Sequence, residues 1–266
     1  MQRKKWRQEL HYDRVGLHAV KHARLPRLYV DAALEPQAKL VLPEDTAHHA
    51  ARVLRLREGE SALLFDGRGG EYEARLSMPG RGRVTAEIGA WRDVERESPL
   101  AVTLVQAISS GEKMDFTIQK AVELGVVSIR PVLSIKSVVR LSAEREAKKL
   151  AHWKRVAIAA CEQCGRNRLP EVRDAMSVES YCRTPGPASL RLLLSPEADS
   201  GLRSIQDRME GAVTLAVGPE AGFSAAEEQL LAGAGFVPVR LGRRILRTET
   251  AALAALAALS ALAGDF

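Results

Sequence analysis

Long apolar runs, paired cysteines and an export signal are missing from this sequence. Its most apolar stretch, the Ala/Leu-rich C-terminal segment, is interrupted by Ser260 and ends at Gly264-Asp265, so it predicts no membrane span. Three cysteines in 266 residues cannot form a dense disulfide framework, which favours a reducing compartment. The N-terminus is basic, but no apolar signal-peptide core follows it. We therefore expect a cytoplasmic protein that does not work at a membrane.

Common nucleotide and metal motifs are missing too. There is no GxxxxGK[ST] motif, and no G-x-G-x-x-G opens the first predicted strand-helix unit, which argues against a P-loop enzyme or a standard dinucleotide binder. His48-His49 has no cysteine or carboxylate at ligand spacing. Cys161 and Cys164 lack a second pair, and Cys182 alone cannot complete a site. We expect neither a metal nor a redox function.

Positive charge is present but concentrated at one end. The chain carries a net charge of +6, and Met1–Arg24 holds seven Lys/Arg against Glu9 and Asp13, so this segment supplies five of the six charges. Such an arm can hold RNA phosphates electrostatically. A solvated extension or a misassigned start codon would produce the same pattern. The composition of the whole chain, 46% hydrophobic and 27% charged over 266 residues, fits a globular enzyme large enough for two domains.

After this extension (residues 1–23), residues 24–92 predict a small β-rich domain. Pro43 to Leu54 suggests one short helix, and glycine-rich turns separate three strand-like runs. These runs are Ser61–Phe65, Glu71–Ser77 and Arg83–Ala90. Together they favour a compact barrel. Residues 93–99 are polar, charged and closed by Pro99, which is typical of a linker.

Residues 100–266 alternate between strand and helix. The expected strands are Ala101–Ile108, Val126–Leu133, Leu190–Leu194, Val213–Val217 and Phe236–Leu241. The expected helices are Met114–Leu124, Ser142–Cys164, Ala225–Leu231 and Ala251–Ala263. This alternation predicts an α/β domain with a parallel sheet and helices on both faces.

Two glycine loops follow the last two strands, Gly218–Gly222 and Gly242–Arg244. Such loops at the carboxyl ends of strands are where small ligands usually bind in α/β sheets. Ser224 and Glu227 have the spacing of a capping box, and Thr248 is expected to cap the last helix. That helix is almost wholly Ala and Leu, so we expect most of its surface to be buried in a core or against a second subunit. By periodicity alone, these loops are equally compatible with ordinary αβ connections.

Four sequence blocks carry a family resemblance. GEKMDFTIQKAVELGV, CEQCGRNRLPEV, GPEAGFSAAE and LGRRILRTETA occur in this order and resemble blocks of the SPOUT methyltransferases. Within that superfamily, the chain from Arg24 to Phe266 is similar to the family that methylates N3 of a uridine in 16S ribosomal RNA, the ribosomal RNA small-subunit methyltransferase E family. The resemblance implies a C-terminal SPOUT domain with a deep trefoil knot, a PUA-like RNA-binding β-barrel domain, S-adenosylmethionine as cofactor, and a homodimer. It also implies 16S ribosomal RNA as substrate, which we expect to be presented within an assembled small subunit.

The resemblance carries over to a set of cofactor-binding residues in the three C-terminal loops. These are Leu194, Ser195, Gly218, Pro219, Glu220, Gly222, Leu241, Gly242, Ile245, Leu246 and Thr250. We expect the glycines to let backbone groups approach the adenosine closely. Ala221 departs from the family's commoner GPEGG. It would be strained if its φ were positive, which puts the detailed contacts of this loop in doubt.

Uridine N3 is a poor nucleophile until its proton leaves, so the site must stabilise an anion or accept the proton. Arg247, at the head of the last helix, is the first catalytic candidate because its guanidinium can hold a uracil carbonyl oxygen. Glu220 and Glu249 are candidate bases. A carboxylate in the first helical turn is also favoured by the helix dipole alone, which offers a structural explanation for Glu249.

A third group of residues is expected to bind RNA. It comprises Arg27, Arg52, Arg55, Arg57, Lys113, Arg166, Asn167, Arg168, Arg243 and Arg244, with Arg68 and Lys120 as weaker candidates. For each arginine taken singly, the alternative to RNA binding is an exposed, solvated side chain without a binding role. Two rival functions remain: methyl transfer to a ribose 2′-hydroxyl or to another base of ribosomal or transfer RNA, and a non-catalytic RNA-binding assembly protein.

Overall fold

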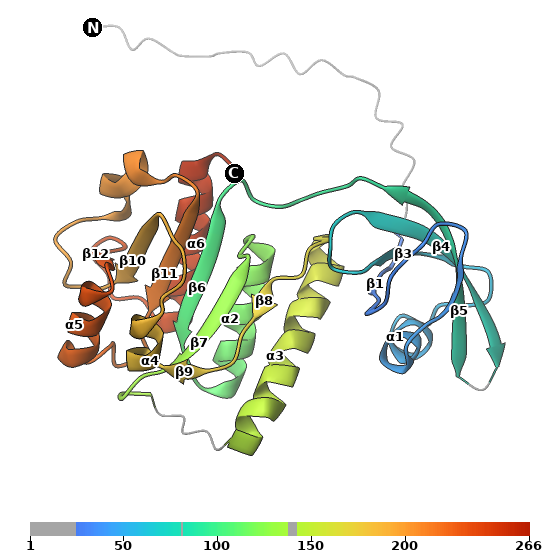
Figure 1. Cartoon of the computed structure of the whole chain (residues 1–266), viewed down its shortest axis with the longest axis horizontal. Coiled ribbons are helices and arrows are strands. Elements are labelled where there is room, and N and C mark those ends of the chain that lie inside the picture. Colours follow the sequence, from blue (N-terminus) through green and yellow to red (C-terminus); the bar gives the residue numbers. More distant parts are fainter. Residues whose placement is uncertain (1–24, 81, 138–142) are drawn as a thin grey trace, which may run out of the picture.

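The computed structural model of the protein describes residues 25–80, 82–137 and 143–266, arranged as two domains (Figure 1). The first domain ends with a strand at Arg92, and the second begins with a strand at Ala101. The predicted linker, residues 93–99, lies between these two strands. The predicted basic extension, residues 1–23, lies outside the described residues.

The N-terminal domain is built on one five-stranded sheet. Its elements are β1 (Arg27–Tyr29), β2 (Lys39–Val41), α1 (Glu44–His48), the π-helix η1 (His49–Val53), β3 (Ser61–Phe65), β4 (Glu71–Gly80) and β5 (Arg83–Arg92). The order is β1-β3-β4-β5-β2, with β1 parallel to β3 and the other pairs antiparallel. The three predicted strands are confirmed. The sequence missed β1 and β2 because three-residue strands carry too little alternation to be recognised.

The C-terminal domain is built on a parallel sheet. Its elements are β6 (Ala101–Ala107), α2 (Gly111–Glu123), β7 (Ser128–Leu133), α3 (Ala143–Cys164), β8 (Glu171–Val172), β9 (Met176–Ser177), α4 (Val178–Arg183), β10 (Leu190–Leu194), the 3-10 helix η2 (Leu202–Arg208), β11 (Ala212–Val217), α5 (Ala225–Gly233), β12 (Val237–Val239) and α6 (Thr248–Ala263). The order is β12-β10-β11-β6-β7-β8, with β9 also pairing β7, and every pair is parallel. The predicted parallel α/β sheet is confirmed.

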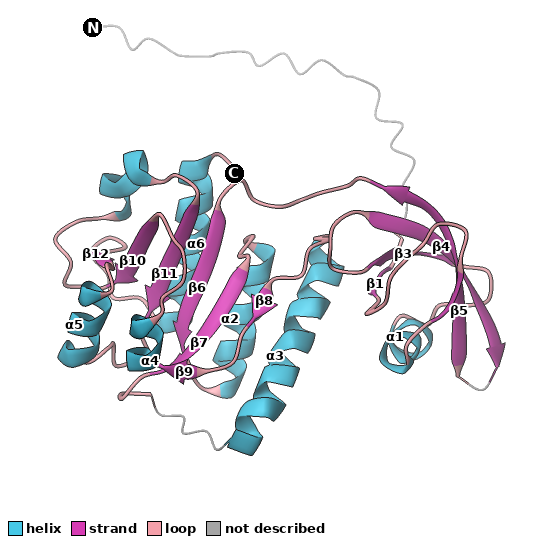
Figure 2. Cartoon of the chain, viewed as in Figure 1, coloured by secondary structure: helices cyan, strands magenta, loops and turns pink. Residues whose placement is uncertain are grey.

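Helices cover both faces of this sheet (Figure 2). Val102 and Leu104 of β6 pack into one core with α2, α3 and α6, whereas Val105 and Ala107 pack into a second core with α4 and α5. Burial on both faces explains why the strands are continuous apolar runs rather than alternating ones. It also leaves the carboxyl ends of the strands free to carry polar loops.

The Ala/Leu-rich helix α6 is buried on one side only. Ala252, Ala255, Leu256 and Leu259 belong to the core shared with α2 and α3, but other small residues of the helix, including Ala254, are exposed. The expectation of burial over most of its surface is therefore only half correct for the single chain. No helix within the described part of the chain is both long and apolar enough to cross a bilayer.

The start of α6 also differs from the prediction. The residue that precedes the helix is Arg247, and Thr248 is the first helical residue rather than the cap. The Thr248 hydroxyl instead donates to the carbonyl oxygen of Gly218 at 2.6 Å. A hydroxyl that was expected to cap the start of its own helix therefore connects that helix to a loop 30 residues away.

The two domains meet at a buried cluster of charges around Glu71. This carboxylate is 1% exposed and accepts hydrogen bonds from Arg27 at 2.6 Å, Arg96 at 3.4 Å and Asn167 at 3.4 Å. Arg27 also donates to Asn167 Oδ1 and to the carbonyl oxygen of Arg166. The cluster thus joins the first domain to the segment that follows α3.

Arg166 holds the other side of the same junction. Its guanidinium makes a bidentate ion pair with Glu97, with N···O distances of 2.5 and 3.0 Å. Its Nη1 donates to the carbonyl oxygen of Val122, in the last turn of α2, at 3.0 Å and to that of Val126, just beyond the helix, at 2.9 Å. Carbonyls at a helix C-terminus lack partners within the helix, and Arg166 supplies a donor there in addition to the Gly125 N–H that reaches Val122 O.

Candidate cofactor and active site

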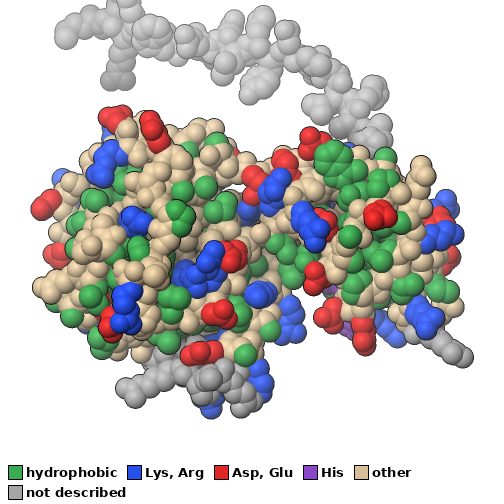
Figure 3. All heavy atoms as spheres, viewed as in Figure 1, with side chains coloured by type: hydrophobic (Ala, Val, Ile, Leu, Met, Phe, Trp, Pro, Cys, Tyr) green, Lys and Arg blue, Asp and Glu red, His purple; other side chains and the backbone are tan. Residues whose placement is uncertain are grey.

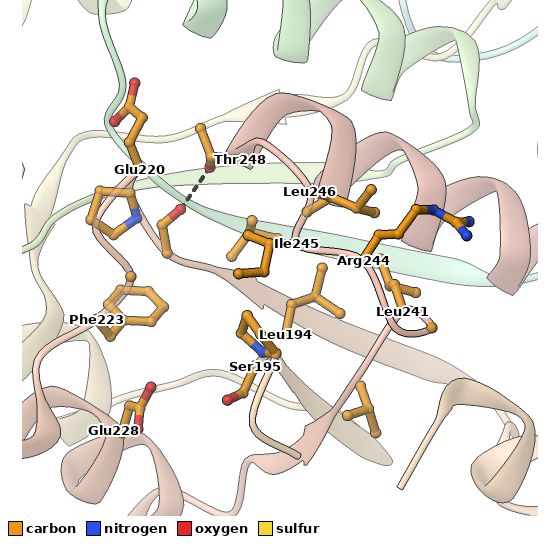
Figure 4. Close-up of a pocket in the computed structure, with 18 residues that line it drawn as sticks. Leu194, Ser195, Glu220, Phe223, Glu228, Leu241, Arg244, Ile245, Leu246 and Thr248 are labelled. Carbon is orange, nitrogen blue, oxygen red and sulfur yellow. Dashed lines mark hydrogen bonds between the residues drawn. The ribbon is translucent and has the colours of Figure 1, made fainter. Parts of the chain in front are cut away.

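A cavity opens at the carboxyl ends of β10, β11 and β12 (Figure 4). It contains about 740 Å³ of space between atoms, including the solvent at its mouth. Its apolar walls are formed by Leu194, Val217, Phe223, Val239, Leu241, Ile245, Leu246 and Ala251. Polar groups are few and come from Ser195, Glu220, Glu228, Arg244 and Thr248. This combination of apolar walls and few polar groups is typical of small-molecule sites.

The loop after β11 has a conformation that two glycines determine. A Cβ added to Gly218 would lie 3.0 Å from the Phe223 amide nitrogen and 3.2 Å from the Phe223 ring, closer than ordinary van der Waals contact, so a side chain there would press against Phe223. Gly222 has a φ of 68° and closes a turn through its N–H to the Pro219 carbonyl oxygen at 2.8 Å. Ala221, in contrast, has a negative φ, because the only non-glycine residues with positive φ in the described chain are Gln37 and Arg55. The departure from GPEGG therefore introduces no backbone strain.

Substitutions at Gly222 and at Ala221 are expected to change cofactor affinity by different amounts. Gly222→Ala places a side chain in the left-handed region at a cost of about 1 kcal/mol, so we expect cofactor binding to weaken roughly fivefold. Ala221→Gly needs no conformational change, and its effect on affinity should stay within about twofold. Calorimetric titration of both variants with S-adenosylmethionine measures the difference. A large gain in affinity for Ala221→Gly would contradict an unstrained Ala221.

A capping box starts the helix after this loop, as the sequence predicted. The Ser224 side chain accepts from the Glu227 N–H, and the Glu227 carboxylate accepts from the Ser224 N–H at 2.8 Å. Glu227 is only 3% exposed. Burial alone would raise its pKa, but hydrogen bonds from the N–H groups of Ser224 and Ile135 outweigh it and hold the pKa below its ordinary value. Glu227 is therefore an ionised anchor at neutral pH.

A chain of hydrogen bonds links β6, α6 and the cofactor loop. The fully buried Gln106 donates from Nε2 to Thr248 Oγ1 at 3.1 Å, and Thr248 in turn donates to Gly218 O, the dashed line in Figure 4. Sequence reasoning missed Gln106 and Phe223 as supports of this site. A glutamine at the end of an apolar strand was the available signal, because buried polar groups need partners.

Glu220 is held by Lys113 from the first turn of α2, with an N···O distance of 3.0 Å. Partial burial raises the pKa of Glu220, but the hydrogen bond and charge of Lys113 prevail, and the pKa lies below its ordinary value. A lower pKa makes this carboxylate a weaker base. Of the two candidate bases, Glu220 is thus the less suitable for accepting a proton.

The cavity fits the cofactor that the sequence resemblance implies. An adenine ring is flat and largely apolar, which suits walls of Leu, Ile, Val and Phe. The carboxylates of Glu220 and Glu228 border the same space. They place negative charge where a molecule with a sulfonium and an ammonium group would be attracted. The residues present are therefore compatible with S-adenosylmethionine.

Comparisons with known proteins agree with this geometry. The RNA methyltransferase domain family matches residues 96–260, and the RNA methyltransferase PUA domain family matches residues 42–89. Ribosomal RNA small subunit methyltransferase E of Buchnera aphidicola is 31% identical over 250 residues, which cover 93% of this chain and 98% of that protein. This chain belongs to the ribosomal RNA small subunit methyltransferase E family.

Solved structures agree with this assignment. Ribosomal RNA small subunit methyltransferase E from Neisseria gonorrhoeae, bound to S-adenosyl methionine, is 42% identical with a TM-score of 0.83, and the match covers 90% of this chain and 98% of that one. A methyltransferase from Legionella pneumophila in complex with the same cofactor is 39% identical with a TM-score of 0.85 and the same coverage. Both relatives share the two-domain arrangement over nearly their whole length, which supports the fold described above.

The structure distributes the predicted site residues unevenly around the cavity. Every residue predicted to bind the cofactor lines it except Thr250, which is exposed on α6. Arg244, predicted to contact RNA, lines the cavity as well, although its side chain extends away from the other labelled residues in Figure 4. Arg247 is exposed and directly precedes Thr248. Glu249 follows Thr248, and its buried Oε2 has no hydrogen-bond partner among the described residues.

Three of the predicted RNA-binding residues are buried at the domain junction instead. Arg166 is 3% exposed, Asn167 is 0% exposed, and the side chain of Arg27 is 10% exposed. All three make the hydrogen bonds around Glu71 and Glu97 described above. Their burial contradicts the prediction that they contact RNA, and it assigns them to the support of the two domains.

The other predicted RNA-binding residues lie at the surface. Arg52, Arg55 and Arg57 are exposed around η1, and Arg55 has a φ of 56°, which is unusual for a side-chain-bearing residue. Arg243 is also exposed, whereas Lys113 and Arg168 are each paired with a glutamate. In Figure 3, positive and negative side chains are intermixed over both domains. Binding of RNA by these residues stays a prediction.

The cysteine and histidine motifs serve structural purposes. Burial raises the pKa of Cys161 to about 12, so its thiol is neither a nucleophile nor a metal ligand at neutral pH. Glu162, next in sequence, accepts from the Tyr29 N–H at 2.9 Å, and His49 approaches it to 3.6 Å. Within the described part of the chain, no three His, Cys, Asp or Glu residues gather as a metal site would require.

Proposed function

We propose that this protein transfers a methyl group from S-adenosylmethionine to N3 of a specific uridine in 16S ribosomal RNA, giving 3-methyluridine. Membership of the ribosomal RNA small subunit methyltransferase E family supports ribosomal RNA of the small subunit as the substrate and S-adenosylmethionine as the methyl donor. The observation that carries the proposal in this chain is the cavity at the ends of β10, β11 and β12, with Arg247 and Glu249 on either side of a wall residue, Thr248.

Bound in this cavity, S-adenosylmethionine would supply an electrophilic methyl group. Leu194, Leu241 and Ile245 would enclose the adenosine and exclude water from the reacting atoms. We further propose Arg247 as the group that holds a uracil carbonyl oxygen while negative charge develops on the base, since the arginine is exposed beside the cavity and has no ion-pair partner among the described residues.

We propose Glu249 rather than Glu220 as the acceptor of the N3 proton. Glu220 is paired with Lys113 and has a lowered pKa, which weakens it as a base. Glu249 has one buried oxygen without a hydrogen-bond partner in the described part of the chain, so the acceptor capacity of that carboxylate is not used up by contacts within the protein. Its place in the first turn of α6 keeps it near Arg247.

The proposal includes a knotted C-terminus and a homodimer. From β12 at the sheet edge, the chain contacts the loop after β10 through Arg240 N and Ser200 O, at 2.9 Å, and then returns to Gly218 of the central loop through Thr248. This course supports the proposed knot. The exposed small residues of α6 and Ile245, which is 85% exposed, support a second subunit packing here.

Recognition of the RNA is assigned to the N-terminal domain, with Arg52, Arg55 and Arg57 as phosphate contacts. The assembled small subunit in the cytoplasm is the proposed setting. The alternative of a non-catalytic assembly protein depended on a cofactor loop disabled by Ala221, and the negative φ of that residue removes this basis.

Incubation with labelled S-adenosylmethionine and small ribosomal subunits that lack their own modification tests the function. Digestion to nucleosides and mass spectrometry should recover labelled 3-methyluridine from 16S RNA. Label in a 2′-O-methylated nucleoside or another base would overturn the N3 assignment. Absence of label from subunits and from free 16S RNA, in the presence of a bound cofactor, would contradict the methyltransferase proposal.

A further inference from the structure

The loop that follows β7 is tied to the cofactor loop by a lysine. Lys136 donates from Nζ to the carbonyl oxygen of Ala221 at 3.3 Å and to that of Phe223 at 3.1 Å. These two carbonyls flank Gly222, the residue with positive φ that turns the cofactor loop. One ammonium group therefore bridges the residues on either side of Gly222 in the cavity wall.

The same loop is anchored a second time by Glu227. The carboxylate accepts from Ser134 Oγ at 3.0 Å and from the Ile135 N–H at 2.9 Å, in addition to its bonds with Ser224. Because Glu227 is buried and ionised, these hydrogen bonds are charge-assisted. Three consecutive residues, Ser134 to Lys136, are thus fastened to both sides of the loop that carries Phe223.

Neither Lys136 nor Glu227 lines the cavity, whereas Gly222 and Phe223 do. Without the ammonium, the Ala221 and Phe223 carbonyls lose the donor that they share. The backbone between them contains Gly222, whose φ and ψ are less restricted than those of any other residue, so this segment is then free to leave the observed turn. The Phe223 ring, which packs on Gly218, moves with it.

We propose that Lys136 is a positioning residue that sets the shape of the cofactor loop, with Ser134 and Glu227 fixing the segment from which it reaches. This inference rests on the proposed function, because it assumes that the cavity takes S-adenosylmethionine. Its physical consequence is that cofactor affinity depends on a residue from the opposite half of the sheet, after β7. The ion pair between Lys113 of α2 and Glu220 is a second contact from that half of the sheet to the same loop.

The test compares Lys136→Met, which keeps the length of the side chain and removes the charge, with Lys136→Arg. Calorimetric titration with S-adenosylmethionine and with S-adenosylhomocysteine, without RNA, should give roughly tenfold weaker binding of both to Lys136→Met. Lys136→Arg should retain affinity within about threefold, because a guanidinium can reach the same carbonyls. Lys154→Met, an exposed lysine of α3 away from this loop, is the matched control and should bind normally.

Thermal unfolding of the cofactor-free variants separates positioning from general stability. Lys136→Met should unfold within about 2 °C of the parent, because an exposed lysine contributes little to overall stability. Unchanged affinity in Lys136→Met, or loss of affinity that Lys136→Arg does not restore, would overturn the role of Lys136. Failure of the parent protein to bind either ligand would instead overturn the proposed function, so the two failures are distinguishable.

Discussion

Replacement of Arg247 by alanine is expected to lower kcat for methyl transfer at least about 100-fold, which is the usual effect of removing a donor to a developing oxyanion. The Kd for S-adenosylmethionine should stay within about threefold, because Arg247 is exposed and does not line the cavity. Single-turnover transfer to small subunits measures the first quantity and calorimetry the second.

Arg243→Ala is the control for this substitution, because Arg243 is an exposed arginine of the same loop that also does not line the cavity. It should raise KM for the RNA and leave kcat within about threefold, as expected of a phosphate contact. Equal losses of transfer and cofactor binding in Arg247→Ala would mean that Arg247 binds the cofactor. Equal kcat values for the two variants would remove Arg247 from the chemistry.

The second large effect concerns stability. Arg166→Ala should lower the free energy of unfolding by about 3–5 kcal/mol, the range found when one partner of a buried ion pair is removed. The change leaves Glu97 without its bidentate partner and removes the side-chain donor to the carbonyl oxygens of Val122 and Val126. Denaturant unfolding followed by circular dichroism measures the loss.

Arg168→Ala is the matched control, two residues further along the same segment. Its side chain is 55% exposed and pairs with Glu95 at the surface, so its removal should cost less than about 1 kcal/mol. Arg166→Lys should remain strongly destabilised, because an ammonium cannot reproduce the paired guanidinium contacts. Normal stability with weakened RNA binding in Arg166→Ala would return this residue to the RNA-binding surface.

The contrast between these arginines explains where sequence analysis of the site failed. The segment Gly165 to Arg168 follows the end of α3, and its charges favoured an exposed RNA-binding loop. Gly165, with a φ of 95°, turns the chain so that Arg166 and Asn167 enter the domain junction while Arg168 stays outside. Burial of a charge depends on partners distant in sequence, here Glu71 and Glu97, and no local pattern identifies them.

Predictions based on local chemistry were more successful. The capping box at Ser224 and Glu227 was confirmed, since both partners lie within one helical turn. The start of α6 was misjudged by one residue, because Thr248 lies inside the helix, where its hydroxyl accepts from Gln106 and donates to Gly218 instead of accepting from the first N–H groups of α6. The family resemblance identified the loops of the cavity, but it assigned no role to Lys136, Gln106 or Phe223.

The sequence by itself determined the longer strands and helices and the parallel sheet and, through the family resemblance, the loops that form the cavity. Apolar runs, helical periodicity and glycine turns are patterns of a few neighbouring residues, so they can be recognised in the sequence without a structure. Only the tertiary structure decided which charged side chains face solvent and which hold the molecule together. A buried charge must be compensated by opposite charges and hydrogen bonds in space, and in this protein those partners come from strands, helices and a linker up to 140 residues apart.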